Sequence, residues 1–237
     1  MTRKLGNRSW ARALLALALL AAAAARAQSF CSSDGQPPPS ALLERFISAD
    51  CEACWSEAGP MAAPGELALD WIVPGSKGSD APLSAAAIRD ATWRLEALQR
   101  DAPAASDVLR HVVQAARPGL RVSHGLPFNG YVGASIELPS PGPGQWTAWL
   151  LLVETVPPGA DGTPIERNLV RNSLQSSWGG TGPLSQQEVS RLYESRPMAI
   201  AEGARPSRLR VVGWVEDARG RLRAIAQSRC AAPGTEG

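Results

Sequence analysis

Four cysteines constrain the fold of this 237-residue chain more than any other feature. Cys51 and Cys54 stand three positions apart in FISADCEACWSEAGP, directly after a short apolar run. The other two, Cys31 and Cys230, lie near the two ends of the chain. Two thiols at the C-x-x-C spacing can form a redox pair, half of a metal site or a structural crosslink. The choice among these three decides what the protein does.

The first 27 residues predict a secretory signal peptide. Residues 1–12 carry four basic residues and no acid, residues 13–25 are all alanine or leucine, and Ala25-Arg26-Ala27 fits a small-x-small cleavage site. These 13 apolar residues fall short of the roughly 20 that a membrane-spanning helix needs, which disfavours the alternative of an uncleaved anchor. We therefore expect a periplasmic or secreted chain that begins near Gln28 and has no stable membrane span after cleavage.

Removal of this leader changes the charge balance. The leader holds five basic residues and no acid, so the mature chain keeps 19 Lys plus Arg against 22 Asp plus Glu. A face that contacts nucleic-acid phosphates needs a clustered excess of Lys and Arg, and nucleic acid is therefore excluded as an expected partner. The 210 residues that remain are enough for one large domain or two small ones.

The even number of cysteines favours disulfides in an exported chain, and four cysteines allow three connectivities. The neighbours Cys51 and Cys54 are the obvious pair, which leaves Cys31 and Cys230. A bridge between these two would tie both termini to the body of the protein, and on the chain-entropy model it would contribute about 4–5 kcal/mol. The alternative is two free thiols in frayed tails, which an oxidising compartment disfavours.

The hydrophobic pattern of the front half predicts alternating strands and helices. We expect a strand at residues 41–47, a short helix at 50–58 and a second strand at 66–73, followed by helices at 84–100 and 106–117. In the second strand, Leu67, Leu69, Trp71 and Val73 fall on one face. The front half therefore reads as α/β.

The back half, after Pro118, predicts mostly antiparallel strands. Ser185-Gln186-Gln187-Glu188 is a capping box that predicts a brief helix through Tyr193. The strands expected on alternation and turn residues span 120–124, 131–138 and 145–156, with a hairpin of 208–216 and 221–227 around Asp-Ala-Arg-Gly.

The position of Cys51 at the start of the expected short helix favours redox chemistry. Free backbone N–H groups and the positive end of the helix dipole stabilise a thiolate there. Cys54 lies one turn further on the same face, where it can resolve a mixed disulfide. Asp50, Glu52 and Glu57 oppose this effect, because nearby negative charge disfavours ionisation of the thiol.

Two other interpretations of the pair stay open. A zinc site would need two more ligands, but the histidines of the mature chain, His111 and His124, are isolated and no second cysteine pair exists. Two thiolates could still hold a soft ion such as Cu(I), although we expect neither a metal nor a cofactor. In the remaining interpretation, Cys51 and Cys54 form a permanent local disulfide.

Three segments, in this order, carry a resemblance to a known family: LLERFISADCEAC, then ERNLVRNSL with Trp178 following, then RLRVVGWVEDARGRLRAIAQSR. Together they resemble a secreted bacterial family of unassigned function, which joins a thioredoxin-like front half to a β-rich back half. The expected organisation is a signal peptide at 1–27, a front domain at 28–118, which the resemblance implies is thioredoxin-like, and a β-rich domain at 119–237. The expected fold class is thus an α/β thioredoxin-like domain followed by a mainly antiparallel β domain.

Two departures from that family concern the surroundings of the cysteines. The family usually has a segment rich in His, Asp, Tyr and Trp after its second strand, where this chain reads DWIVPGSKG. Thioredoxin-like enzymes also place a cis-proline opposite the cysteines, at the start of a strand. The nearest candidate is Pro103, but a helix rather than a strand is predicted after it, so this region is degenerate.

The sequence therefore predicts a periplasmic thiol-disulfide exchange protein with Cys51 as the attacking and Cys54 as the resolving residue. Its expected partner is a protein thiol or disulfide. The alternative is a non-catalytic envelope protein for binding or assembly, in which the C-x-x-C is a structural disulfide.

Overall fold

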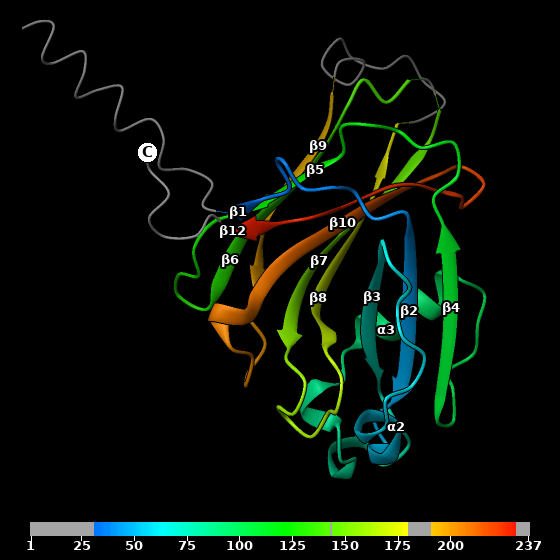
Figure 1. Cartoon of the computed structure of the whole chain (residues 1–237), viewed down its shortest axis with the longest axis vertical. Coiled ribbons are helices and arrows are strands. Elements are labelled where there is room, and N and C mark those ends of the chain that lie inside the picture. Colours follow the sequence, from blue (N-terminus) through cyan, green and yellow to red (C-terminus); the bar gives the residue numbers. More distant parts are fainter. Residues whose placement is uncertain (1–30, 143, 180–190, 231–237) are drawn as a thin grey trace, which may run out of the picture.

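Most of the regular secondary structure in the described part of the chain belongs to two β-sheets (Figure 1). The computed structural model describes residues 31–142, 144–179 and 191–230. The expected signal peptide lies outside these residues. Within them, no helix has the length and apolar character needed to cross a membrane.

The larger sheet has seven strands, and the smaller has five. The order in the larger sheet is β11 (Leu222–Gln227), β10 (Leu209–Asp217), β7 (Trp146–Val156), β8 (Arg167–Trp178), β3 (Glu66–Val73), β2 (Ala41–Ser48) and β4 (Ser106–Val112). The order in the smaller sheet is β12 (Arg229–Cys230), β1 (Cys31–Ser32), β5 (Arg121–His124), β6 (Tyr131–Pro139) and β9 (Arg191–Ala199). The α-helices of the described chain are α2 (Glu52–Ser56) and α3 (Arg89–Ala97), and short 3₁₀ turns span Gly78–Asp80, Ser84–Ala86 and Pro206–Arg208.

The predicted fold class, an α/β thioredoxin-like domain followed by an antiparallel β domain, is wrong. β2 and β3 are parallel, and α2 does connect them, but β3 also pairs in parallel with β8 at Asp70 and Leu169. β2, β3 and β4 therefore continue into the sheet formed by β7, β8, β10 and β11. The seven-stranded sheet draws strands from both sides of the expected boundary at residue 118.

The helix predicted at 106–117 is the second error, because its first seven residues form β4. β4 pairs antiparallel with β2. Leu109 and Val113 pack against a buried core, whereas the intervening Val112 is 59% exposed. The apolar spacing fits a helix and a strand equally well, and pairing with β2 decides for the strand.

Some of the remaining predicted helices and strands are present in the structure, and others are shortened or absent from the described residues. The helix expected at 84–100 is reduced to α3, preceded by a 3₁₀ turn. Most of the helix expected at 185–193 lies outside the described residues, and its last three positions belong to β9. The short helix after β2, the three strands expected at 120–156 and the C-terminal hairpin are confirmed. β8 was not predicted.

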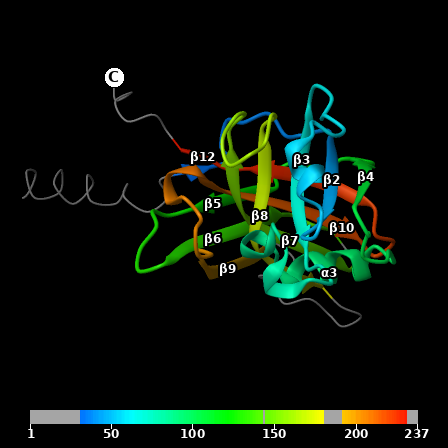
Figure 2. The same ribbon diagram turned by 90° about the horizontal axis from the view of Figure 1, so that it is seen from below.

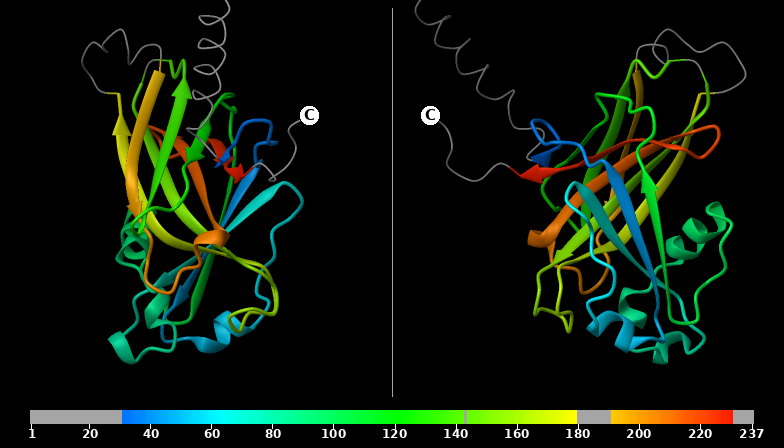
Figure 3. Two further views of the ribbon diagram at one scale, coloured as in Figure 1. Left: turned by 90° about the vertical axis from the view of Figure 1, so that its left-hand side faces the viewer. Right: turned by 45° about the vertical axis from the view of Figure 1, so that its right-hand side comes forward.

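Apolar side chains cover both faces of the seven-stranded sheet. On β7, Leu150 and Leu152 face the smaller sheet, while Trp149 and Leu151 belong to the core under α3. Figure 2 shows α3 lying against the sheet beside β3. The two sheets meet closely at Gly213, because a Cβ there would come within 2.7 Å of Ile136 Cδ1. Figure 3 shows the two sheets from two further sides.

A buried ion pair lies in the core under α3. The Glu44 carboxylate accepts hydrogen bonds from Arg94 Nη2 (2.8 Å) and from Trp71 Nε1 (3.1 Å). Arg94 also donates to Glu216 (3.1 Å), and its guanidinium stacks on the ring of Trp149 at 4.7 Å. Both Glu44 and Arg94 are at most 1% exposed. Such a pair contributes most when every polar atom has a partner, as here.

This pair predicts loss of stability in acid. Burial by itself would raise the pKa of Glu44, but the charge of Arg94 and hydrogen bonds from His111 and Arg94 lower that pKa to about 2. A lowered folded-state pKa gives stability that is present above the unfolded-state value of 4.5 and is lost as the pH falls toward 2. Urea unfolding should show about 3 kcal/mol of this loss between pH 6 and pH 2. The Glu44→Gln variant should lack this part of the pH dependence; an unchanged pH profile would contradict the assignment.

Candidate functional site

The C-x-x-C lies at the end of β2, on the α2 side of the molecule (Figure 1). Cys51 is the N-cap residue of α2, and Cys54 lies inside that helix. The two form a disulfide. Both residues are half-buried, and Glu52 and Ala53 between them are exposed. The structure thus places the predicted pair together at the surface.

The Cys51 sulfur accepts a hydrogen bond from a backbone N–H group. The N–H of Cys54 donates to Cys51 Sγ over 3.3 Å. A hydrogen bond to the charged form of a group favours that form, so this N–H would stabilise a Cys51 thiolate after reduction. Because α2 has only five residues, we attribute the effect to this local donor rather than to a helix dipole.

Asp50, which the sequence analysis counted against ionisation of Cys51, is bonded to a neighbouring turn. Its carboxylate accepts hydrogen bonds from the side chain (2.8 Å) and backbone (2.7 Å) of Ser76 and from the backbone of Lys77 (3.2 Å). These bonds, the Ser76 hydroxyl foremost, lower the pKa of Asp50. A Cβ at Gly75 would overlap the Asp50 carboxylate, so a larger residue there would displace Asp50 from the turn. Asp50 therefore fixes the loop that precedes Cys51.

A buried arginine anchors the C-terminal end of α2. Arg167 Nη2 donates to the backbone carbonyls of Cys54 (3.3 Å), Trp55 (3.0 Å) and Glu57 (2.6 Å). Arg167 is 1% exposed, and burial lowers its pKa against the opposing charge of Asp70. The guanidinium replaces the next helical turn as partner for the last carbonyls of α2.

Asp70 holds Arg167 in place. Its carboxylate accepts hydrogen bonds from Arg167 Nη1 (3.1 Å), Arg45 Nη2 (2.7 Å) and the backbone N–H of Asn168 (2.9 Å). Asp70 and Arg45 are also buried. This Arg45–Asp70–Arg167 cluster connects β2, β3 and β8 to the helix that carries Cys54. No sequence pattern used above predicts this cluster, although an acid within the apolar strand ELALDWIV is a signal that could have revealed it.

Trp55 completes the support of α2. Its indole Nε1 donates to the carbonyl of Asp161 over 2.7 Å, and the Arg167 guanidinium lies 5.3 Å from its ring centre. Trp55 is 7% exposed and belongs to an apolar cluster with Ile72, against which Cys54 packs. Trp55 is therefore the core residue through which α2 packs against the body of the protein.

The region of the expected cis-proline also differs from the prediction. Contrary to that prediction, a strand does follow Pro103, because β4 begins at Ser106. Every described peptide bond is trans. β4 is one of the two edge strands of its sheet within the described chain. It begins close to the cysteine loop, since the Ser48 N–H donates to Ala105 O over 2.8 Å and the Cys51 N–H donates to Ser48 O over 3.0 Å.

The second disulfide joins Cys31 to Cys230, the pairing that the sequence analysis expected. The two residues face each other on β1 and β12, and Cys31 also faces His124 on β5. Burial lowers the pKa of His124, against a hydrogen bond to the backbone of Gly125. The other histidine, His111, belongs to the other sheet, on β4, where its Nε2 lies 3.3 Å from Glu44 Oε2.

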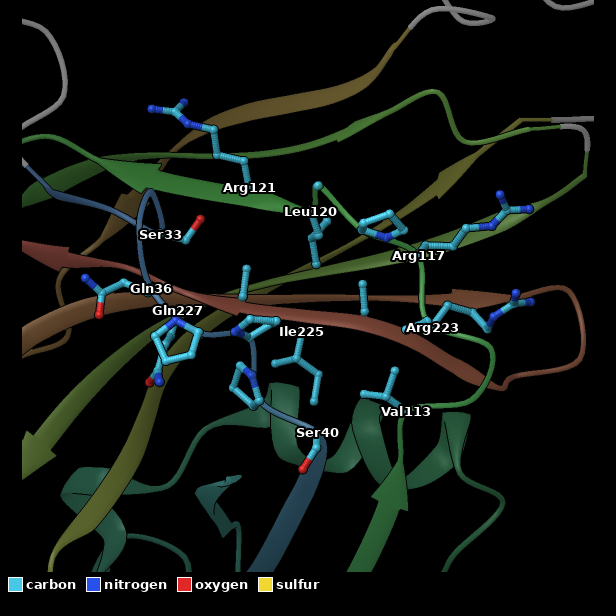
Figure 4. A pocket seen from close by; sticks show the side chains of 18 of the residues that line it. Ser33, Gln36, Ser40, Val113, Arg117, Leu120, Arg121, Arg223, Ile225 and Gln227 are labelled. Atoms are coloured by element: carbon cyan, nitrogen blue, oxygen red, sulfur yellow. The ribbon is translucent and has the colours of Figure 1, made fainter. Parts of the chain in front are cut away.

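A cavity of about 720 Å³ opens between β11 and the segment QPPP at residues 36–39 (Figure 4). Its floor is apolar and includes Val113 and Ile225. The guanidinium groups of Arg121 and Arg223 at its rim extend away from that floor and pair with Asp34 and Asp217, at 2.7 and 2.8 Å. The Asp34 carboxylate in the lining is bound by Arg121, and we assign no chemistry to this cavity.

Comparison with known proteins identifies no protein that is similar to this chain. The expected similarity to a secreted thioredoxin-like family therefore stays a prediction, and the functional argument depends on the residues of this chain. No family model, no curated protein and no solved structure matches the chain.

Proposed function

We propose that this protein is an exported thiol-disulfide exchange protein in which Cys51 attacks and Cys54 resolves. The observation that carries the proposal is the half-exposed Cys51–Cys54 disulfide on a helix whose far end is fixed by Arg167. A purely structural crosslink within one turn closes a loop of only four residues and restricts the unfolded chain little. Exchange chemistry, by contrast, needs an accessible sulfur with a second sulfur in reach.

The exchange step balances as follows when the reduced protein meets a partner disulfide. The Cys51 thiolate attacks one partner sulfur, a mixed disulfide forms, and the other partner sulfur leaves as a thiolate. Cys54, deprotonated, then attacks Cys51 Sγ and releases the second partner sulfur. The partner gains two electrons and becomes a dithiol, while Cys51 and Cys54 are oxidised to the disulfide. The reverse sequence oxidises a partner dithiol.

The edge strand β4 supports docking of an extended partner segment. Edge strands present unpaired main-chain groups that can accept an added strand. The residues of β4 are exposed or half-buried, and Ser106 at its start pairs with Ile47, four residues before Cys51. A segment paired along β4 would therefore bring its own sulfur near the C-x-x-C without a cis-proline loop.

The test is to trap the mixed disulfide with the Cys54→Ala variant, expressed in the native host. Without the resolving thiol, the covalent intermediate on Cys51 should persist, and non-reducing gels should show higher-mass species that disappear on reduction. The matched control is the Cys51→Ser, Cys54→Ala double variant, which should show none. If Cys54→Ala yields no more adducts than this control, the pair is a structural crosslink and the protein serves a non-catalytic role.

A further inference from the structure

Three potential ligand residues, Cys31, His124 and Cys230, lie together on the neighbouring strands β1, β5 and β12. Figure 1 shows these three strands side by side. β1 lies between β5 and β12, and Cys31 directly faces His124 on one side and Cys230 on the other. Residues that face each other on adjacent strands project from the same side of the sheet. Accordingly, the two sulfurs and a ring nitrogen of His124 all lie within 4.8 Å of one another.

The hydrogen bonding of His124 leaves one ring nitrogen free. Nδ1 lies 2.9 Å from the carbonyl oxygen of Gly125, and a carbonyl only accepts, so Nδ1 carries the proton and Nε2 has the lone pair. His124 is 5% exposed, and Nε2 is buried without a hydrogen-bond partner in the described structure. A ring fixed through Nδ1 to a backbone carbonyl, with Nε2 bare, is the arrangement of metal-binding histidines.

We propose that reduction of the Cys31–Cys230 disulfide opens a site for a thiophilic cation, Zn(II) or Cu(I), held by these two cysteines and His124. Two thiolates and one imidazole suit either ion. The three ligands suffice for three-coordinate Cu(I), and Zn(II) would add a water. Cys230 is exposed, which gives an ion access to the otherwise buried group. In the disulfide state the sulfurs are bonded to each other and the site is closed.

The redox step needs a dithiol reductant. Its two thiols are oxidised to a disulfide, and the two electrons and two protons convert the Cys31–Cys230 disulfide into two thiols. Binding of the cation then releases the two thiol protons, since the ligands are thiolates. The site therefore closes again when a disulfide partner removes the two electrons.

The strands that carry the ligands have other attachments, which keep the ligands together after reduction. Asp34, three residues after Cys31, forms a two-pronged ion pair with Arg121 (2.7 Å from Nε and 2.7 Å from Nη2). The backbone N–H of Ser33 donates to Val122 O over 2.9 Å. Near Cys230, Ser228 exchanges hydrogen bonds with Val211 through its backbone N–H (2.8 Å) and its hydroxyl (2.9 Å).

The experiment uses the full mature chain with Cys51→Ser and Cys54→Ser, so that the C-x-x-C contributes no ligand. The protein is reduced with a phosphine and titrated with Co(II) as a probe for Zn(II), and separately with Cu(I) against a coloured chelator. We expect one ion per chain, with sulfur-to-cobalt charge-transfer bands. The His124→Leu variant should bind at least about tenfold more weakly, and the control His111→Gln should bind unchanged.

Two outcomes would overturn the site: equal binding by His124→Leu, or equal binding by the oxidised chain. If His124→Leu fails to fold, the imidazole nitrogen resonances of the unsubstituted histidine decide. The Nε2 resonance of His124 should shift when Zn(II) is added to the reduced chain, and an unshifted resonance contradicts the proposal. Because Cys51 and Cys54 are absent throughout, the result is independent of the proposed exchange function.

Discussion

Replacement of Arg94 by methionine is expected to lower the free energy of unfolding by about 3–5 kcal/mol. The reason is that Glu44, which is fully buried, would lose the guanidinium that donates to both of its oxygens. The ring of Trp149 would lose its stacked cation as well. An uncompensated buried carboxylate is far more costly than a complete pair is beneficial. Urea unfolding at pH 7 measures the change.

Arg100→Met is the matched control for this prediction. Arg100 also pairs with a carboxylate, Asp107 at 2.7 Å, but its side chain is 49% exposed. An exposed pair contributes about 0–1 kcal/mol, so this variant should unfold almost like the parent. A second variant, Arg94→Met combined with Glu44→Leu, should recover part of the loss because the fully buried carboxylate is removed together with its guanidinium. Equal effects of Arg94→Met and Arg100→Met would contradict the role given to the buried pair.

Replacement of Arg167 by methionine is expected to cost about 3–5 kcal/mol, because buried carbonyl groups lose their hydrogen-bond donor, and to free the C-terminal end of α2. Asp70 would keep Arg45 but lose its second guanidinium. The carbonyls of Trp55 and Glu57 would lose their buried donor. Hydrogen exchange of the α2 amides should become faster than the change in global stability alone explains, because the helix would open locally.

Arg191→Met serves as the control here. Arg191 lies 3.6 Å from Glu137 and its side chain is 53% exposed, so stability should change by about 1 kcal/mol at most. Hydrogen exchange in α2 should also stay unchanged in this variant. If Arg167→Met leaves α2 exchange as slow as in the parent, the anchoring of the C-x-x-C helix by Arg167 is wrong.

Local patterns in the sequence were enough for the elements that depend on neighbours in the chain. The alternation of LRVVGWVED and LRAIAQ, with a polar turn between them, predicts the hairpin of β10 and β11. The short helix after β2 follows from the stop at Gly59-Pro60. The bridge of Cys31 to Cys230 was expected by elimination and is present. Each of these needs no information about distant segments.

The elements that local patterns do not predict depend on contacts with segments that are distant in the chain. β4 is a strand because β2 is available for pairing, although Leu109 and Val113 also fit a helical stripe. β8 carries the polar residues Arg167 and Asn168 at buried positions. A hydrophobic pattern expects apolar residues at such positions, and it therefore does not predict this strand. Asp70, 97 positions before Arg167, is the contact that makes this burial possible. The anchor of the C-x-x-C helix thus depends on pairs that one strand's sequence does not reveal.

The most direct measurement for the exchange function is a glutathione titration of the folded chain, with alkylation and peptide mapping to follow each cysteine pair. We predict that Cys51 and Cys54 become labelled reversibly without denaturant, at a potential within roughly −270 to −120 mV, the range of exchange-active dithiols. Labelling of these two residues only after unfolding, or only below roughly −300 mV, would contradict the account and leave the pair as a structural disulfide.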